Sequence, residues 1–458
     1  MKYEVLKRSH VKRNILIAVV IVFVLSAIIL TFTKAKYRVT ESIPLVSGTI
    51  NYDLSDLNLI GAYIQEGEEY KQTNEIPTNG YEFNSEKSYC TVNGENINAT
   101  INFDIETQTL SVVPLTKKGT KCYLYFDEKA YTCKGIACES ILANMTEFRT
   151  RTDFSTTITE TTTGTIYKSA NESQYDDDGE VYYFAGNPTD NWFQFGTNSS
   201  GQPLYWRIVR INGDGSVRLI YNGTSKATTG NSTMINTSQA FNGSYNNNAY
   251  VGYMYTSGDP HGLSTNSNIK TTLDNWYISN LSDEAEYLDG NAGFCGDRYP
   301  STGSSSSNGS GGTGTTTTYY GAYIRLYINK SPSFKCRDSQ DLYTTPGSSK
   351  GNGALKVSST DKTTTPIGLI TADEVAFAGG VYGSANRSYY LYNNEYYWAM
   401  SPYYFDGSNA NVFVVDDYGG LYYYYVDYTY GVRPVINIRS DVAITGTGTT
   451  TDPYRLVS

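Results

Sequence analysis

The chain has 458 residues, of which 35 are basic and 45 acidic, and its formal net charge is −10. It has no basic stripe of the kind that a phosphate backbone requires, which excludes nucleic acid as a partner. Charged residues make up only 17% of the chain, whereas tyrosine occurs 44 times. A composition rich in Tyr, Thr, Ser, Asn and Gly favours short strands and polar turns, so we expect a mainly β (α+β) protein.

The N-terminus carries a basic leader and then an uncharged apolar run over residues 15–32. A helix rises about 1.5 Å per residue, so the run covers about 27 Å, close to the hydrocarbon core of a bilayer. The basic excess before the run favours an inside N-terminus. We therefore predict a cytoplasmic tail at 1–14, a transmembrane helix at 15–33 and an ectodomain held outside the plasma membrane by a single pass. A cleaved signal peptide is the alternative, although its apolar region is usually shorter.

All six cysteines follow the apolar run, and their even number suits disulfides in an oxidising compartment. The sequence does not determine the pairing, but each pair can lie within one module. The expected disulfides are Cys90–Cys122, Cys133–Cys138 and Cys295–Cys336. A zinc site is less favoured, because there is no C-x-x-C motif and only His261 among the extracellular residues is a histidine.

A small extracellular β module is predicted over residues 39–148. Segments 99–105, 109–115 and 120–126 alternate apolar and polar residues between turns, and a two-sheet sandwich would bury their inward faces. A short helix is expected near its end, at 138–148. The Thr-rich segment 149–175 is expected to be a linker or stalk, with an extended stretch at the start of the next domain as the alternative.

The larger domain is predicted over 176–458. Residues 204–211 and 216–221 flank Asn-Gly-Asp-Gly, which is typical of a hairpin, and both strands are apolar on each face, so the hairpin should be central. Apolar residues at helical spacing predict a helix over 268–281. A capping box, Thr371 to Glu374, starts a short helix at 372–378. Residues 301–318 are low in complexity, and we expect a mobile loop there.

Four strands are expected near the C-terminus. They are residues 397–402, 410–415, 421–426 and 433–438, joined by turns rich in Asp and Gly. In the third strand, tyrosines point to both faces, so one set must lie on a surface.

These segments carry a family resemblance. The phrases YWRIVRINGDGSVRLI (205–220), GLITADEVAFAGG (368–380), YYWAMSP (396–402) and GVRPVINI (431–438) resemble uncharacterised surface proteins of gut Firmicutes and related bacteria. In arrangement the region 176–458 is similar to the C-type-lectin-like fold of formylglycine-generating-enzyme homologues and of the variable receptor proteins of diversity-generating retroelements. This resemblance implies a ligand-binding domain.

The candidate ligand-binding site is the tyrosine-rich C-terminal stretch. If the fold is lectin-like, its aromatic and polar residues lie on or near the binding face, where they can stack on sugar rings or anchor a protein. The residues are Tyr403, Tyr404, Asp406, Asn409, Asn411, Tyr418, Tyr422, Tyr424, Tyr428 and Tyr430. The competing interpretation is a half-buried aromatic sheet without a ligand.

No catalytic site, cofactor or metal site is predicted. The cysteine pair used by formylglycine-generating enzymes is missing, because no cysteine follows Cys336, and no hydrolase or P-loop motif occurs. Two acidic turns, 176–180 and 212–215, could offer oxygens to Ca²⁺, but the simpler interpretation is that both are polar turns. We therefore expect a surface binding protein or adhesin with a glycan or protein ligand. The alternatives are an enzyme acting on extracellular glycan or cell wall, and a structural envelope protein.

Overall fold

The computed structural model describes residues 58–77, 80–104, 109–113, 119–129, 131–226, 229–301 and 314–457. It divides into two compact units, Met1–Ala130 and Tyr131–Ser458, and each has a hydrophobic core. Both units consist mainly of strands, so the mainly β expectation is confirmed. The predicted tail at 1–14 and transmembrane helix at 15–33 lie outside the described residues, as does most of the low-complexity loop. Within the described residues, no helix has the length and apolar character to cross a membrane.

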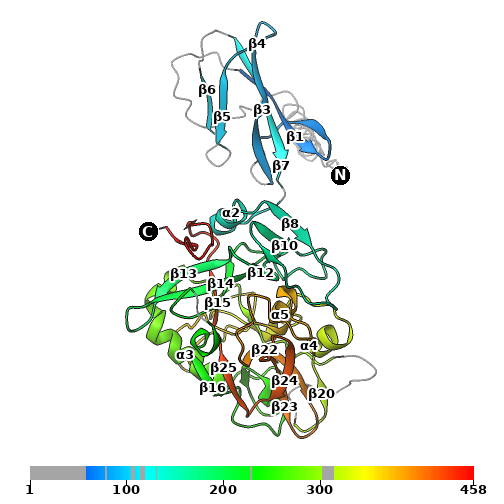
Figure 1. Ribbon diagram of the computed structural model, residues 1–458, viewed down its shortest axis with the longest axis vertical. Helices are drawn as coiled ribbons and strands as arrows, with labels where there is room; N and C mark the ends of the chain where they lie inside the picture. The colour runs from blue at the N-terminus through cyan, green and yellow to red at the C-terminus, as the bar shows by residue number, and fades with distance from the viewer. Residues whose placement is uncertain are drawn as a thin grey trace, which may run out of the picture. The chain divides into compact units, whose positions relative to one another are not determined.

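The first unit is built on a five-stranded sheet with the order β2-β1-β7-β3-β4 (Figure 1). Strand β1 runs parallel to β7, and β3 runs antiparallel to β7 on its other side. A hairpin of β5 and β6 forms a separate pair. The strands are β1 (Asn58–Glu66), β2 (Glu69–Thr73), β3 (Tyr81–Val92), β4 (Glu95–Ile97), β5 (Thr100–Asp104), β6 (Thr109–Val113) and β7 (Thr120–Glu128).

The hairpin and the five-stranded sheet share one core. Alternate residues of β5 are buried, as the period of two along a strand requires. Phe103 of β5 packs edge-on against Phe126 of β7, with ring centroids 5.5 Å apart. Cys90 and Cys122 face each other across β3 and β7 and form a disulfide, as expected.

The second unit contains two larger sheets. The seven-stranded sheet has the order β26-β15-β14-β11-β10-β8, with β13 also on β14; the six-stranded sheet has the order β16-β25-β22-β23-β24, with β20 also on β22. The first sheet comprises β8 (Glu147–Thr150), β10 (Thr165–Lys168), β11 (Tyr182–Tyr183), β13 (Trp192–Thr197), β14 (Pro203–Ile211), β15 (Val217–Tyr221) and β26 (Val435–Ile438). The second comprises β16 (Asn236–Ala240), β20 (Thr318–Tyr319), β22 (Tyr397–Phe405), β23 (Ala410–Val415), β24 (Leu421–Tyr425) and β25 (Thr429–Val432).

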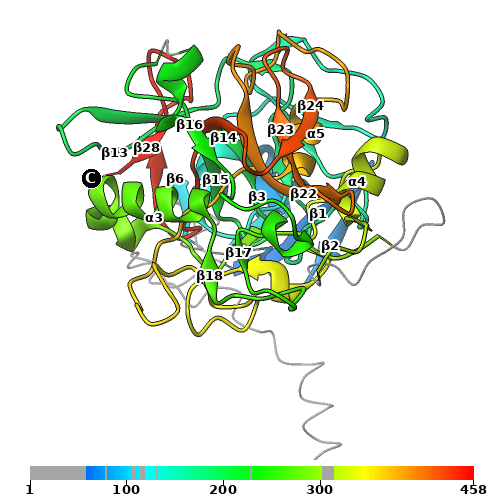
Figure 2. The same cartoon turned by 90° about the horizontal axis from the view of Figure 1, so that it is seen from below.

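Short pairs and helices complete this unit (Figures 1 and 2). The pairs are β9 (Thr161–Thr162) with β12 (Asn187–Pro188), β17 (Met254–Tyr255) with β18 (Thr265–Asn266), β19 (Phe294–Cys295) with β21 (Leu342–Tyr343), and β27 (Ile444–Thr445) with β28 (Arg455–Leu456). The helices are α2 (Ile136–Leu142), α3 (Asn268–Asn280), α4 (Gly321–Tyr323), the π-helical η4 (Ile324–Ile328) and α5 (Ala372–Ala378). Four 3₁₀ turns are η1 (Gly230–Thr233), η2 (Asn248–Val251), η3 (Ser282–Tyr287) and η5 (Ser339–Asp341).

The chain passes from one sheet to the other at Arg433. The buried guanidinium donates to the carbonyls of Tyr221 and Leu391, at 3.2 and 2.9 Å. Two residues earlier, a Cβ on Gly431 would lie 1.8 Å from the sulfur of Met234 and 2.9 Å from the backbone oxygen of Tyr396, so a larger residue would force these groups to shift. Residues 431–433, which open the phrase GVRPVINI, therefore join the two sheets.

The expected linker at 149–175 is instead part of the second unit, which begins at Tyr131. Strands β8 and β10 pair in parallel and extend the seven-stranded sheet. Ile166 is fully buried, and the guanidinium of Arg151 donates to the carbonyl of Ala376 at 3.0 Å. The segment is poor in large apolar residues, but the few that it has enter the core, and threonine suits a strand. The alternative prediction, an extended stretch at the start of the next domain, therefore describes this segment better.

Several local expectations are confirmed. The β14–β15 hairpin lies inside its sheet, between β11 and β26. Helix α3 begins after Ser267, which accepts from an amide of its first turn. Helix α5 has the capping box between Thr371 and Glu374 and ends at Gly379 with φ of 119°. The other two disulfides also form as expected, in the pairs Cys133–Cys138 and Cys295–Cys336.

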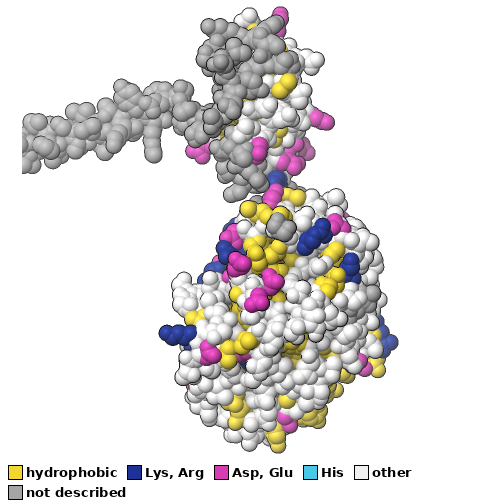
Figure 3. All heavy atoms as spheres, turned by 90° about the vertical axis from the view of Figure 1, so that its left-hand side faces the viewer, with side chains coloured by type: hydrophobic (Ala, Val, Ile, Leu, Met, Phe, Trp, Pro, Cys, Tyr) yellow, Lys and Arg dark blue, Asp and Glu magenta, His cyan; other side chains and the backbone are white. Residues whose placement is uncertain are grey.

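The surface carries few charges. On the face shown in Figure 3, charged side chains are scattered among a majority of uncharged ones. This agrees with the low charged fraction of the sequence.

Candidate functional site

Tyrosine rings from several segments meet beside the six-stranded sheet. The segments are β20, the α4–η4 turn (321–328), the loop after α5, and the strands β22, β24 and β25 with their connections; β20, α4, β22 and β24 lie together in Figure 1. We call the connected rings the tyrosine surface. Its members are Tyr319, Tyr323, Tyr327, Tyr382, Tyr396, Tyr403, Tyr404, Tyr422, Tyr423, Tyr424, Tyr425, Tyr428 and Tyr430.

A buried ring holds the tyrosine surface in place. Tyr403 is only 4% exposed and stacks on Tyr423, with centroids 4.1 Å apart and planes 8° apart. On its other side it lies parallel to Tyr382, at 5.7 Å, and its hydroxyl donates to the Tyr382 hydroxyl at 3.0 Å. Aromatic pairs of this kind contribute about 0.5–1.5 kcal/mol each beyond their buried area. The neighbouring rings are therefore fixed before any ligand arrives.

The outer rings face solvent. Tyr327, Tyr422 and Tyr428 are 42%, 38% and 46% exposed, although large aromatic side chains usually bury most of their area. Tyr422 belongs to β24, which is the last strand of its sheet. The ammonium of Lys330 lies over the rings of Tyr327 and Tyr382, at 5.9 and 5.6 Å. The surface thus presents aromatic rings, hydroxyls and one cation to water.

The phenols of Tyr382, Tyr403 and Tyr404 stay protonated over the physiological range. Burial raises the pKa of Tyr382 to about 12, with its tyrosine neighbours adding to the shift. Burial raises the pKa of Tyr403 and Tyr404 as well. These three hydroxyls can therefore donate as well as accept a hydrogen bond at neutral pH.

The predicted site residues divide into two groups. Those that belong to the tyrosine surface are Tyr403, Tyr404, Tyr422, Tyr424, Tyr428 and Tyr430. Tyr418 stands apart: it is 49% exposed on the turn after β23, and the guanidinium of Arg387 lies over its ring at 4.6 Å. No aromatic ring among the described residues contacts it.

The predicted polar residues of the β22–β23 turn shape the turn itself. The Asp406 carboxylate accepts from the amides of Ser408 and Asn409, at 2.8 and 2.6 Å. The Asn409 side chain donates back to Asp406, and buried Asn411 donates to the Asn409 carbonyl at 2.9 Å. Asp406 is exposed, but its oxygens, like the amide nitrogen of the Asn411 side chain, are engaged within the turn.

Seven members of the tyrosine surface were not among the predicted site residues, and five of these precede Tyr403 in the chain. Tyr319, Tyr323 and Tyr327 recur every four residues, a spacing that would have placed them on one face of a helix. Their proximity to Tyr403 depends on the pairing of β20 with β22, which no local pattern reveals. Tyr382 and Tyr396 likewise reach the surface from loops.

A charged pocket of about 400 Å³ lies elsewhere in the second unit and brings the two acidic turns together. At its base, buried Glu374 binds Arg210 and Arg218, at 2.9 and 3.0 Å. Asp176 binds Arg210 at 3.1 Å and accepts the Gly213 amide at 2.8 Å. These carboxylate oxygens are engaged in ion pairs and turns, which agrees with the interpretation of the two segments as polar turns. Among the described residues, no cluster of His, Cys, Asp or Glu is placed to hold a metal.

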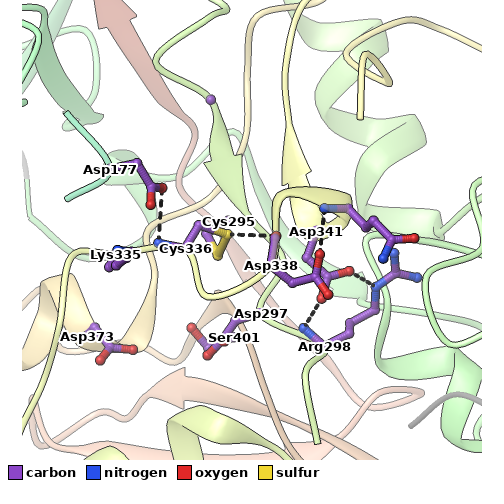
Figure 4. Close-up of a disulfide and its surroundings, with 12 residues drawn as sticks. Asp177, Cys295, Asp297, Arg298, Lys335, Cys336, Asp338, Asp341, Asp373 and Ser401 are labelled. Atoms are coloured by element: carbon purple, nitrogen blue, oxygen red, sulfur yellow. Dashed lines mark hydrogen bonds and ion pairs between the residues drawn. A yellow bond between two sulfur atoms is a disulfide. The ribbon is translucent and has the colours of Figure 1, made fainter. Parts of the chain in front are cut away.

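The Cys295–Cys336 disulfide borders this pocket (Figure 4). On one side, the Cys336 amide donates to Asp177 at 3.3 Å, and burial raises the pKa of Asp177. On the other side, Asp341 binds the buried Arg298 at 2.9 Å. Asp341 also holds His261, at 3.0 Å, and this hydrogen bond raises the pKa of the imidazole.

Comparison of the chain with protein-family models, curated proteins and solved structures gives no match. The residues and their geometry therefore carry the functional argument alone.

Proposed function

We propose that this chain is a binding protein that recognises a glycan through its tyrosine surface. The observation that carries the proposal is the set of solvent-facing rings of Tyr327, Tyr422 and Tyr428, which rest on rings that are already packed. Exposed aromatic rings can stack on the apolar faces of sugar rings. Because the rings beneath them are fixed, little conformational entropy is lost on binding.

The chemistry of the tyrosine surface favours a glycan over a protein partner. Protein hot spots combine aromatic anchors with desolvated pockets and a surrounding ring of apolar contacts. Here every ring of the surface carries a hydroxyl, and sugar hydroxyls need such partners. A protein ligand remains an outcome of the test below.

Two broader parts of the proposal concern fold and location. We propose that the second unit, which includes residues 176–458, has a C-type-lectin-like arrangement, as the resemblance of its quoted phrases implies, and that the first unit is a sandwich-like spacer. We also propose that residues 15–33 anchor the chain in the plasma membrane with both units outside. The three disulfides support an oxidising location.

The charged pocket gives less support to an enzyme. A glycoside hydrolase needs one carboxyl group that can donate a proton and a second that can act as base or nucleophile. Burial alone would raise the pKa of Glu374, but Arg218 and Arg210 outweigh it and lower the pKa. Glu374 is therefore poorly suited to donate a proton at neutral pH.

A glycan array with the full-length chain in detergent tests the proposal. The test variant is Tyr422→Ala with Tyr428→Ala, and the matched control is Tyr418→Ala, an equally exposed tyrosine outside the surface. We expect selective glycan binding that the double variant lowers about tenfold or more and the control leaves unchanged. Absence of glycan binding, or capture of a protein partner in its place, would refute the glycan assignment.

A further inference from the structure

A second pocket, of about 460 Å³, borders the α4–η4 turn on the side opposite to the tyrosine surface. Gly321, Ile324 and Arg325 line the pocket, whereas Tyr323 and Tyr327 belong to the tyrosine surface. In a helix of about 3.6 residues per turn, these two sets of positions fall on different faces. We call this cavity the basic pocket. Its lining residues are Ser301, Gly321, Ile324, Arg325, Asn329, Ser333, Lys335 and Arg337.

The charged residues that line the basic pocket are all cations: Arg325, Lys335 and Arg337. The charged pocket has acidic and basic lining residues together, and Lys335 and Arg337 lie on the rim that the two pockets share. In a chain with a net charge of −10 and a low charged fraction, three cations without an acidic lining residue are an unusual grouping. Arg325 is paired with buried Asp297 and Asp373, so the uncompensated positive charge of the pocket lies at Lys335 and Arg337, where it would attract an anion.

Two buried aspartates fix the orientation of the Arg325 guanidinium. Its Nη2 binds Asp297 at 2.6 Å and Asp373 at 2.7 Å, and its Nε donates to Asp373 at 2.8 Å. Both aspartates are almost completely buried, whereas the Arg325 side chain keeps 20% of its area exposed. Its Nη1 has no hydrogen-bond partner within the described part of the chain. A guanidinium held on one edge with the other edge open is preorganised for an oxyanion.

Lys335 and Arg337 flank the disulfide-bonded Cys336, which lies between Asp177 and Asp338 in Figure 4. Both side chains are exposed, and neither forms an ion pair with a described residue. The Arg337 guanidinium lies 4.0 Å over the ring of Tyr299, which restricts its position. The cystine therefore holds two free cations at the same rim.

We propose that the basic pocket binds an oxyanion group, a carboxylate, sulfate or phosphate. Arg325 supplies the fixed donors at the wall, and Lys335 and Arg337 supply charge and further donors at the rim. The group can be a substituent of a larger ligand or a free anion, because the three cations recognise the same chemistry in both. The inference stands independently of glycan binding at the tyrosine surface.

Isothermal titration calorimetry on the full-length chain in detergent tests this site at constant ionic strength. The probes are sodium sulfate, sodium phosphate, a heparin-derived tetrasaccharide and its desulfated counterpart. Binding of the sulfated tetrasaccharide alone identifies a substituent as the ligand, and binding of the inorganic salts identifies a free anion. Either result supports the site, and absence of binding by every probe would overturn it.

A pair of matched double variants locates the binding. Lys335→Gln with Arg337→Gln removes the two rim cations, and both side chains are exposed, so folding should be retained. The control, Lys121→Gln with Lys362→Gln, removes the same charge from exposed positions that do not line the pocket. We expect the rim variant to lower affinity about tenfold or more, and the control to change it little, because hydrogen bonds from charged donors are strong and local. Equal losses of affinity in both double variants would show non-specific charge attraction and refute the pocket. The Tyr422→Ala, Tyr428→Ala variant should bind the anion with unchanged affinity.

Discussion

Replacing Glu374 tests how the second unit is held together. Its carboxylate is buried, binds Arg210 and Arg218, and accepts the Thr371 amide at 2.9 Å. Gln keeps the shape of the side chain but leaves two buried guanidinium groups with less compensation. Breaking a buried pair in this way costs about 3–5 kcal/mol, whereas losing an exposed pair costs about 0–1 kcal/mol. We therefore expect Glu374→Gln to lower the free energy of unfolding by about 3 kcal/mol or more.

Urea denaturation followed by tryptophan fluorescence measures this loss. The matched control is Glu160→Gln, which removes an ion pair to Arg149 from a side chain that is 55% exposed. The Glu374 pKa is lowered in the folded state, so its stabilising contribution is present above its ordinary pKa of 4.5 and is lost as pH falls further. The difference between wild type and Glu374→Gln should therefore shrink at acid pH. Equal destabilisation by the two variants at pH 7 would refute this account.

Two further perturbations test the same unit. Burial raises the pKa of Asp297 to about 6, so the folded carboxyl binds a proton that the unfolded one does not between pH 3.8 and 6. As pH falls across that window, this carboxyl should add up to about 3 kcal/mol to the free energy of unfolding of the wild type. Urea melts at pH 4, 5, 6 and 7 should show no such gain for Asp297→Asn. Identical pH profiles for the two proteins would contradict this prediction. Replacing Cys295 and Cys336 by alanine opens a link across 41 residues, which in the chain-entropy description costs about 4 kcal/mol. A loss below about 1 kcal/mol in the same assay would show that the disulfide does little for stability.

Features that depend on local chemistry were predictable from the sequence. A capping box and a left-handed glycine are encoded within nine residues, and helix α5 has the predicted bounds. The β14–β15 hairpin likewise follows from an Asn-Gly-Asp-Gly turn between two apolar runs. The three disulfides follow from proximity within each unit.

Features that depend on pairing between distant segments were not predictable from the sequence. Strand β25 (Thr429–Val432) was expected to be a connection between strands, because its pairing with β16, which lies far earlier in the chain, has no local signal. The Thr-rich segment was expected to be a linker, since nothing local shows that Ile166 enters the core. In the candidate site, the tyrosines of β22 and β24 were predictable from their density. The contribution of Tyr323 and Tyr327 was not, because it requires the α4–η4 turn to pack beside β22.

Tyrosine nitration by tetranitromethane, read by peptide mass spectrometry with and without the tightest glycan of the array, tests the proposed binding surface most directly. Tyr327, Tyr422 and Tyr428 are exposed and should be nitrated in the free protein. The account predicts that the glycan protects these three rings and leaves Tyr418 as reactive as before. Protection of Tyr418 alone, or no protection of the three, would contradict it.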